Sequence, residues 1–419
     1  MKHVVVIGGG VAGLSCATIL AREKFRVTLL ERRPYLGGRA CTQPTTPPLD
    51  NGPHLVSGNY RMLRGLLDYV GKPLPIDAKF TSIEWFDDKN RKQRLTPGKF
   101  RLFTLWEMYR AFGLDGLRFA KCLFALSLTH QSKWKTVDDW VQHHRFSDRI
   151  RDFLRLFVMS TINTPIELTD FSLFRTVVTE SLFLKGEYAK LFRVTPLTEM
   201  IITPLRDNLL QNGVDIQTGI PVTQIQPSES CITVICGSTE IECDEVVLAV
   251  PARARMLLIS DSDIQYSPIV TVRIQVQGIK PGWVGFSKGA IDWVFVSAGT
   301  PAILEAVTSG NPEWASLSHQ DIYRNVAEQL QTIFPELVIV KEMGIVKELT
   351  ATPLQTQQWQ QARLPPKLVI PHVWRASDDL ATGLPATLES AACAGVWTAL
   401  AITGKLRGDA NEICPRTLS

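Results

Sequence analysis

Three glycines and one acidic residue near the start of the sequence have the types and spacing needed to hold a dinucleotide. Gly8, Gly10 and Gly13 belong to the run GGGVAG, and Glu31 ends the next apolar run. The first glycine allows a tight turn, the second lets backbone amides approach a pyrophosphate, and the third permits close packing of a helix on a strand. The carboxylate can accept a hydrogen bond from an adenosine ribose, and it would repel the 2′-phosphate of NADP. These residues alone leave NAD and FAD open.

A second group of glycines and arginines follows directly, since residues 31–39 read ERRPYLGGR. A glycine pair lets the main chain approach a flat or phosphorylated ligand, and a guanidinium can bridge phosphate oxygens. Arg32, Gly38 and Arg39 are therefore candidate cofactor-binding residues; the alternative is a loop with a surface arginine. The pattern resembles that of two-dinucleotide-binding-domain flavoproteins, which include amine oxidases and carotenoid desaturases. This resemblance favours FAD over NAD.

One histidine stands among turn-forming residues. Residues 49–58 read LDNGPHLVSG, and Asp, Asn, Gly and Pro together indicate a sharp reversal of the backbone. An imidazole titrates near physiological pH, so His54 is a candidate for donating a proton in catalysis. The alternative is that His54 caps or hydrogen-bonds the backbone of this turn.

Predicted strands and helices must position these residues. The β-branched run 3–7 predicts a buried parallel strand, the glycines lead into a helix over 14–22, and a second strand covers 25–30. Further helices and strands of the same unit are expected at 196–212, 242–251, 367–370 and 386–400. This order of strand, glycine-rich turn, helix and strand predicts a Rossmann-type unit whose parts are separated in the sequence.

The intervening segments predict a second unit. An apparent hairpin over 83–95 precedes a largely helical region. Antiparallel strands are expected at 269–277, 291–296 and 303–308. We therefore expect an α/β fold with a discontinuous Rossmann-type FAD-binding domain and a mixed α+β substrate-binding domain. The first would comprise residues 1–70, 192–258 and 350–419, and the second residues 71–191 and 259–349.

The composition limits the classes of partner. The 419 residues are 45% hydrophobic and carry a net charge of only +4, so bulk charge gives no reason to expect nucleic acid. The eight cysteines lack the spacing of a metal site, so we expect no metal and reduced thiols in a cytoplasmic protein. We also expect neither a signal peptide nor a membrane-spanning helix, because the sequence has no suitable apolar run.

A basic and aromatic stretch favours peripheral contact with a membrane. Residues 89–94 read KNRKQR, Lys99 and Arg101 follow, and aromatic and aliphatic side chains crowd 100–112 and 119–128. Such a stretch can dock on an anionic bilayer. The alternative is a solvated hairpin beside ordinary core helices.

Three further stretches carry a more specific resemblance. They are LDNGPHLVSGNY from residue 49, YSPIVTVRIQV from residue 266 with IDWVF after it, and TGLPATLESA from residue 382. Together with the order of segments, they resemble the squalene-associated FAD-dependent desaturases, also known as hydroxysqualene dehydroxylases of hopanoid and squalene biosynthesis. The resemblance implies FAD, an apolar isoprenoid substrate and other enzymes of the squalene pathway as partners.

The resemblance also implies roles for particular residues. His54 would lie at the flavin edge and protonate a leaving hydroxyl, Val222 would lie near the adenine, and a helix beginning at Thr387 and Leu388 would face the flavin pyrimidine. Family members usually carry Gly-Asp-Trp after the last strand, with the aspartate bound to the cofactor. Here Trp374 would match the tryptophan, so that His372 and Val373 would stand in the Gly-Asp positions. Asp378 or Asp379 would then substitute for the aspartate, or the contact would be lost.

The reaction implied by the resemblance is reductive. Reduced flavin would give hydride to the allylic cation left when hydroxysqualene loses water, and the aromatic segments between 100 and 183 would be either the wall of an apolar tunnel or plain core. A carotenoid-type desaturase would remove hydride from carbon instead, and an amine oxidase would take a small polar substrate. A non-catalytic protein that keeps the dinucleotide fold is a further alternative.

Overall fold

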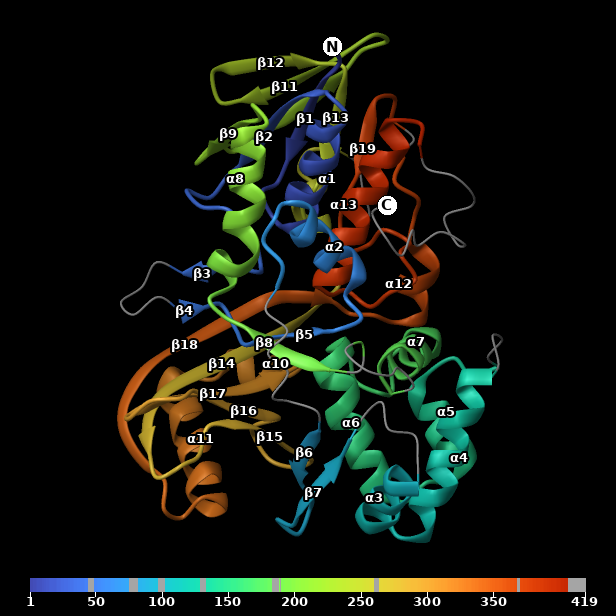
Figure 1. Cartoon of the computed structure of the whole chain (residues 1–419), viewed down its shortest axis with the longest axis vertical. Coiled ribbons are helices and arrows are strands. Elements are labelled where there is room, and N and C mark those ends of the chain that lie inside the picture. The colour runs from blue at the N-terminus through green and yellow to red at the C-terminus, as the bar shows by residue number, and fades with distance from the viewer. Residues whose placement is uncertain are drawn as a thin grey trace.

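The computed structural model describes residues 1–43, 49–74, 82–96, 102–128, 133–182, 188, 190–259, 264–367 and 370–405. One unit is built on a parallel sheet and a second on a larger mixed sheet, and they are stacked along the longest axis of the molecule (Figure 1). Residues 99–101 of the basic stretch and 368–369 of an expected strand lie outside the described residues.

The upper unit in Figure 1 contains a five-stranded parallel sheet in the order β19-β13-β1-β2-β9. Its strands are β1 (His3–Ile7), β2 (Arg26–Glu31), β9 (Asp215–Thr218), β13 (Glu245–Leu248) and β19 (Val373–Arg375). The first strand of the chain lies in the centre and is buried along its whole length. Its unbroken apolar sequence fits a strand covered on both faces.

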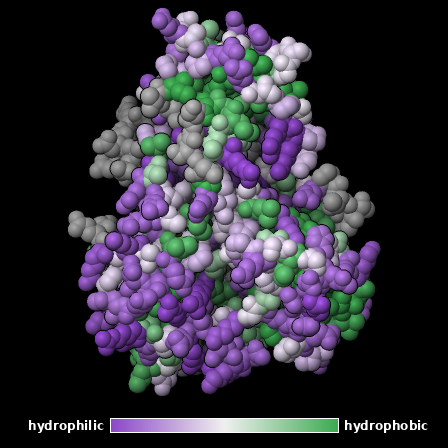
Figure 2. Space-filling view, turned by 180° about the vertical axis from the view of Figure 1, so that it is seen from behind, coloured by the Kyte–Doolittle hydropathy of each residue, from purple (hydrophilic) through white to green (hydrophobic). Residues whose placement is uncertain are grey.

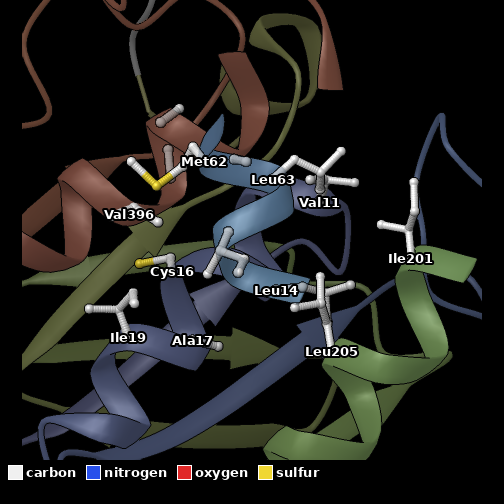
Figure 3. Close-up of a cluster of buried hydrophobic side chains, with 14 of the residues drawn as sticks. Val11, Leu14, Cys16, Ala17, Ile19, Met62, Leu63, Ile201, Leu205 and Val396 are labelled. Atoms are coloured by element: carbon white, nitrogen blue, oxygen red, sulfur yellow. The ribbon is translucent and has the colours of Figure 1, made fainter. Parts of the chain in front are cut away.

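Helices cover one face of this sheet. They are α1 (Val11–Arg22), α8 (Thr203–Gln211) and α13 (Leu388–Ile402), with α2 (Arg61–Tyr69) beside them. Figure 3 shows Leu14 of α1 among Leu63 of α2, Leu205 of α8 and Val396 of α13, all of which are buried in one hydrophobic cluster. This packing fixes the start of α1 relative to the start of α13.

A small antiparallel sheet covers the other face. It consists of β10 (Gln224–Pro227), β11 (Ile232–Cys236) and β12 (Thr239–Cys243). Val5 and Ile7 of β1 pack against Ile232 and Val234 of β11, while Val4 and Val6 face the helices. The alternation of side chains along β1 thus divides the core into two layers.

The lower unit contains a seven-stranded sheet in the order β18-β14-β17-β16-β15-β6-β7. Its strands are β6 (Ile83–Phe86), β7 (Lys92–Leu95), β14 (Tyr266–Gln277), β15 (Gly282–Phe286), β16 (Trp293–Val296), β17 (Ala302–Ser309) and β18 (Val338–Pro353). All neighbours are antiparallel except β6 and β15, which are parallel. The expected hairpin and the three expected strands are therefore present.

Two groups of helices complete the lower unit. Short α10 (Pro312–Ser316) and α11 (His319–Ile333) share a core with the sheet. The second group is α3 (Leu102–Phe112), α4 (Leu114–Leu128), α5 (Val137–His144), α6 (Asp148–Ile162) and α7 (Phe171–Leu182). Buried aromatic rings of these helices, including Phe119 and Trp140, share one core with Trp85 of β6. Much of the aromatic stretch expected between 100 and 183 is therefore protein core.

Short elements join the two units. The ribbon of β5 (His54–Ser57) and β8 (Leu191–Val194) lies between the large sheets, near β14 and β18 (Figure 1). Other short elements are β3 (Thr42–Gln43), β4 (Leu49–Asp50), the π-helix η2 (Thr198–Ile202), α9 (Ala252–Arg255) and α12 (Gln357–Ala362). The α/β fold with a discontinuous Rossmann-type unit is confirmed. The domain boundaries stay predictions, and β18 itself crosses the one placed at residue 350.

The surface is mixed in character. Figure 2 shows hydrophilic side chains over much of the lower half of the back face. No helix within the described residues is long and apolar enough to span a bilayer. The seven cysteines described by the structure are free thiols.

Candidate functional site

The first glycine-rich turn contains two glycines that packing requires and one that borders free space. Gly8 has a φ of 112°, and a Cβ there would overlap the carbonyl oxygen of Ala249. A Cβ at Gly13 would overlap the carbonyl oxygen of Gly8. At Gly10 the nearest atom to a Cβ would be the Cα of Gly38, 4.0 Å away. Gly8 and Gly13 are thus needed for packing, whereas Gly10 borders free space at the start of α1.

The second glycine pair lies beside the first turn. The Gly37 amide donates to the Gly9 carbonyl at 2.8 Å, and Gly38 has a φ of 59°. Gly10, the N-cap of α1, has no side-chain cap, so the first amides of that helix have no side-chain acceptor at this position. Two glycine turns and a helix N-terminus therefore surround one space, which suits an anionic pyrophosphate.

The predicted acid lies at the carboxyl end of β2. Glu31 is buried, and its carboxylate accepts hydrogen bonds from the Gly9 amide at 2.8 Å and the Arg33 amide at 2.9 Å. Arg32 is exposed, whereas Arg33 donates to the Gly38 carbonyl at 3.2 Å. Arg33 was missed because two adjacent arginines carry no sequence signal that tells which of them turns toward the glycines.

Val222 follows β9, the strand that pairs with β2. It is partly buried and packs at the margin of the cluster shared by β1 and β11. Just before it, the Gly219 and Ile220 amides donate to the carbonyls of Arg33 and Glu31 at 2.8 and 3.0 Å. This segment therefore runs along the end of β2 where an adenosine would lie if Glu31 bound its ribose.

The last strand of the parallel sheet corrects one expectation. The strand was expected at 367–370, but β19 covers Val373–Arg375 and pairs with β13. His372 precedes this strand, and Trp374 donates from its indole nitrogen to Glu245 at 2.7 Å. His372 and Val373 thus do not occupy the Gly-Asp positions, because those positions follow the last strand rather than begin it.

Asp378 and Asp379 follow the carboxyl end of β19. Asp378 is buried, and one of its carboxylate oxygens accepts from Arg39 at 2.7 Å. Its other oxygen is buried without a hydrogen-bond partner among the described residues. Asp379 instead forms ion pairs with Arg255 at 2.5 Å and Arg375 at 3.3 Å. Asp378 therefore has an acceptor to offer a ligand, while Asp379 belongs to a structural cluster.

The start of α13 carries two of the predicted cofactor-binding residues. Thr387 is its N-cap and accepts from the Ser390 amide, and Leu388 is its first residue. Glu389, which sequence reasoning missed, reaches α2 and accepts from the Met62 and Leu63 amides at 2.8 and 3.0 Å. Burial raises the pKa of the Glu389 carboxyl to about 7. The available signal was an acid in a helix otherwise made of small and apolar residues.

His54 begins β5 and is partly buried. Its Nδ1 lies 2.9 Å from the Gly52 carbonyl oxygen, so Nδ1 must be the protonated nitrogen that donates to it. Burial lowers the pKa of His54, which makes the neutral ring the main form near neutral pH. In that form Nε2 carries a lone pair. The backbone bond expected as the alternative is therefore present, and donation from Nε2 requires a second proton.

A polar patch faces the turn from the large sheet. A Cβ at Gly52 would lie 3.5 Å from Thr271 Oγ1 of β14. Arg273, two residues along the same face, donates from Nε to Glu305 of β17 at 3.0 Å. Among the described residues, Asn51 Oδ1, Thr271 Oγ1 and Arg273 Nη2 are buried without a hydrogen-bond partner. Sequence reasoning missed this patch, for which the signal was an arginine inside an apolar strand.

Comparison with known proteins identifies the family. The family model for flavin containing amine oxidoreductase matches residues 11–276, which is more than half of the chain. The chain belongs to this family. It is therefore an FAD-dependent oxidoreductase, as the sequence indicated.

Relatives within the family match along almost the whole chain. A hydroxysqualene dehydroxylase of Zymomonas mobilis is 25% identical over 94% of this chain and 97% of its own length. One of Sinorhizobium fredii is 24% identical over 94% and 96%. A carotenoid phi-ring synthase of Streptomyces griseus is 29% identical but covers 62% of this chain and 54% of that protein.

Solved structures share the fold. An oxidoreductase from Methanosarcina mazei has a TM-score of 0.76 at 15% identity, covering 96% of this chain and 100% of that one. A putrescine oxidase has a TM-score of 0.70 at 16% identity, covering 96% and 99%.

The residues around the glycine turns fit FAD. Free space borders Gly10, the amides of α1 point toward it, and Asp378 presents an unpartnered buried acceptor. A buried acceptor without a partner is costly unless a ligand or water supplies a donor. FAD can satisfy both groups, because its diphosphate accepts hydrogen bonds from backbone amides and its hydroxyls donate to a carboxylate.

Proposed function

We propose that this protein reduces an isoprenoid alcohol, hydroxysqualene, to squalene. The observation that carries the proposal is the similarity to two hydroxysqualene dehydroxylases over 94% of the chain. The shorter match to a carotenoid phi-ring synthase supports an isoprenoid substrate more generally. The enzymes that supply hydroxysqualene are then the partners we propose.

The chain would hold the cofactor through three sets of contacts. The amides at Gly10 and the start of α1 bind the diphosphate, Glu31 binds the adenosine ribose, and Asp378 accepts a hydrogen bond from a hydroxyl of the cofactor. Arg39 fixes the Asp378 carboxylate. When bound and reduced, FAD supplies the hydride for the carbon that loses oxygen.

The polar patch suits a substrate with a single oxygen. Thr271 Oγ1 and Arg273 Nη2 are buried donors without partners beside the turn that carries His54. A hydroxyl placed against them would satisfy groups that otherwise stay unpaired. The long hydrocarbon would then lie along neighbouring apolar surface, so the patch would select the carbon that bears the hydroxyl.

Loss of the hydroxyl requires a proton. As the C–O bond breaks, the oxygen keeps the bonding electrons and leaves as water once it has gained a proton, while the carbon becomes an allylic cation that accepts hydride. We assign the proton to Nε2 of His54 in its doubly protonated form, with Nδ1 held by Gly52. The cation is saturated by the hydride, so the substrate gains one hydride and one proton and releases water.

The test is a single turnover without oxygen. FAD-loaded, chemically reduced protein is mixed with hydroxysqualene, flavin reoxidation is followed by absorbance, and squalene is measured by mass spectrometry. We expect squalene to form in proportion to oxidised flavin. A Thr271→Val variant should retain FAD and form squalene more slowly, with Leu210→Ser, exposed on α8, as a matched surface control.

A negative result would lead to a different class of substrate. Flavin that stays reduced in the presence of hydroxysqualene, with no squalene, contradicts the proposal. The next substrate to test would then be a carotenoid-type polyene with oxidised flavin, because the synthase relative matches at 29% identity.

A further inference from the structure

The helical hairpin of α3 and α4 exposes an unusual number of large apolar side chains. On α3, Phe103, Trp106 and Tyr109 are 51%, 52% and 50% exposed. On α4, the exposed apolar residues are Leu114, Leu117, Phe124 and Leu128. We call this surface, together with its exposed cations, the hairpin face. So many large apolar side chains exposed on one helical hairpin indicate a site of interaction rather than an ordinary solvent-facing helix surface.

The opposite sides of both helices already have partners. Met108 and Phe112 of α3 and Phe119 and Leu123 of α4 are buried in the same hydrophobic cluster. Residues on the hairpin face therefore do not serve the core of this chain. In Figure 1 the hairpin lies at the end of the molecule opposite the parallel sheet.

The exposed charges on the hairpin face are mainly basic. Arg110 and Lys121 are exposed, Arg118 is exposed but forms an ion pair with Asp115 at 2.8 Å, and every exposed position of α3 and α4 that the structure describes is apolar or basic. The two acidic residues of the hairpin already have hydrogen-bond partners within the chain. Glu107 is buried and accepts from the Thr96 amide at 2.8 Å, and Asp115 accepts from the Ser147 amide at 2.8 Å.

Aromatic rings and cations are interleaved on this face. Phe103 and Trp106 stack with ring centroids 6.0 Å apart, and the Arg110 guanidinium lies 5.6 Å from the Trp106 ring centre. Aromatic residues insert at the level of lipid headgroups, and nearby cations are attracted to anionic lipids. We infer that the hairpin face docks the protein on the surface of an anionic lipid bilayer.

An anionic bilayer fits the hairpin face better than a second protein does. A protein partner would need acids to match Arg110 and Lys121, and the hairpin of a second copy offers none, because Glu107 is buried and Asp115 is paired with Arg118. An anionic bilayer offers negatively charged headgroups and an apolar interior together. Binding to it needs no fixed set of partner side chains. The inference concerns the resting protein and does not depend on hydroxysqualene being its substrate.

The test is co-sedimentation of the FAD-loaded full chain with vesicles in the absence of substrate. Phosphatidylcholine vesicles are compared with vesicles that also contain phosphatidylglycerol. We expect binding to the anionic vesicles that weakens as salt is raised. Equal binding to both, or no binding to either, would overturn the inference.

Variants separate the apolar and the charged contributions. The double variant Phe103→Ser and Trp106→Ser should lose most vesicle binding, whereas Leu210→Ser, which removes an apolar residue 54% exposed on α8, should not. Arg110→Gln with Lys121→Gln should weaken binding about fivefold for each cation removed. Lys341→Gln, on the far strand β18, is the matched charge control.

Because all the substituted side chains are exposed, we expect every variant to fold. Flavin absorbance checks that each variant still holds FAD. Concentration-dependent dimerisation that is abolished by the Phe103 and Trp106 changes, without vesicle binding, would instead assign the hairpin face to a second copy of the chain.

Discussion

At the scale of single residues, glycines in one motif have different physical reasons for being glycine. A side chain at Gly13 would meet the Gly8 carbonyl, and one at Gly10 would enter open space. Sequence spacing names both positions as cofactor-binding. Only the neighbouring backbone tells which of them also holds the fold together.

This difference gives the first prediction. Gly10→Ala should fold, because Gly10 has an ordinary φ of −78°, but it should lose FAD because the methyl group enters the space for the diphosphate. Gly13→Ala should lower the free energy of unfolding by about 3 kcal/mol or more even without FAD. Flavin absorbance and thermal unfolding of the apo proteins measure both effects. Equal apo stability of the two variants would contradict this account.

The second prediction concerns His54 and pH. Because burial lowers its pKa, the protonated form that we assign to catalysis becomes common only at acid pH. The rate of the reductive step should rise as pH falls through this lowered pKa and level off below it. His54→Gln should retain FAD and lose that dependence. An unchanged pH profile in the variant would remove His54 from proton donation.

The third prediction concerns Glu389. Its folded-state pKa of about 7 lies above the ordinary value of 4.5, so the folded protein binds the extra proton between these values. The free energy of unfolding should therefore fall as pH rises across this window, by on the order of 3 kcal/mol. Glu389→Gln should lack this contribution. Thermal unfolding at several pH values tests it, and parallel curves for the two proteins would contradict it.

At the residue level, local spacing is enough to predict which glycines and which acid share the first turn. Glu31 accepts from the Gly9 amide beside Gly8 and Gly10, and Thr387 is the N-cap of α13, while their contacts to a cofactor stay predictions. The position of Asp378 could not be read in the same way. It depends on where β19 ends, and that is set by pairing of Val373 with Val246, a contact between distant parts of the chain.

At the scale of elements, α13 and α1 are held unusually close. A Cβ at Gly395 would overlap the Ala12 carbonyl and crowd Ser15. The small residues of α13 thus allow it to pack closely against another helix. Because α13 is expected to begin at the cofactor, the spacing of the two helices would set the width of that site.

The fourth prediction follows from this spacing. Gly395→Ala should lower the free energy of unfolding by about 1–3 kcal/mol and reduce FAD retention, although Gly395 lies inside α13 and not among the predicted cofactor-binding residues. Gly10→Ala is the matched control for the stability effect alone, since it adds the same methyl group where no protein atom is crowded; the wild-type protein is the reference for FAD retention. Retention of FAD at wild-type level in Gly395→Ala would show that the helix spacing does not govern the site.

At the scale of the whole molecule, segments far apart in the sequence build each unit. The resemblance and the strand patterns predicted this discontinuity. The ribbon of β5 and β8 was not predicted, because pairing of His54 with Val194 joins two short segments that have no strong strand signal of their own. That ribbon places the turn at Gly52 against β14, and so brings the predicted histidine to the missed polar patch.

The fifth prediction tests the cofactor as part of this assembly. Because FAD binds the folded chain, its removal should lower the unfolding temperature, and added FAD should restore it in a concentration-dependent way. At a free concentration one hundred times the dissociation constant, the gain is about 2.7 kcal/mol. An unfolding temperature independent of FAD would mean that the cofactor contributes nothing to holding the distant segments together.

The late position of β19 and α13 in the sequence also has a consequence for synthesis. A nascent chain forms the glycine turns early, but Asp378 and the start of α13 leave the ribosome only after the entire large sheet. Until then β13 is an unpaired edge that can associate with other strands. We expect cofactor loading to be one of the last events of biogenesis, so that an interrupted translation product would carry the nucleotide-binding motif without retaining flavin.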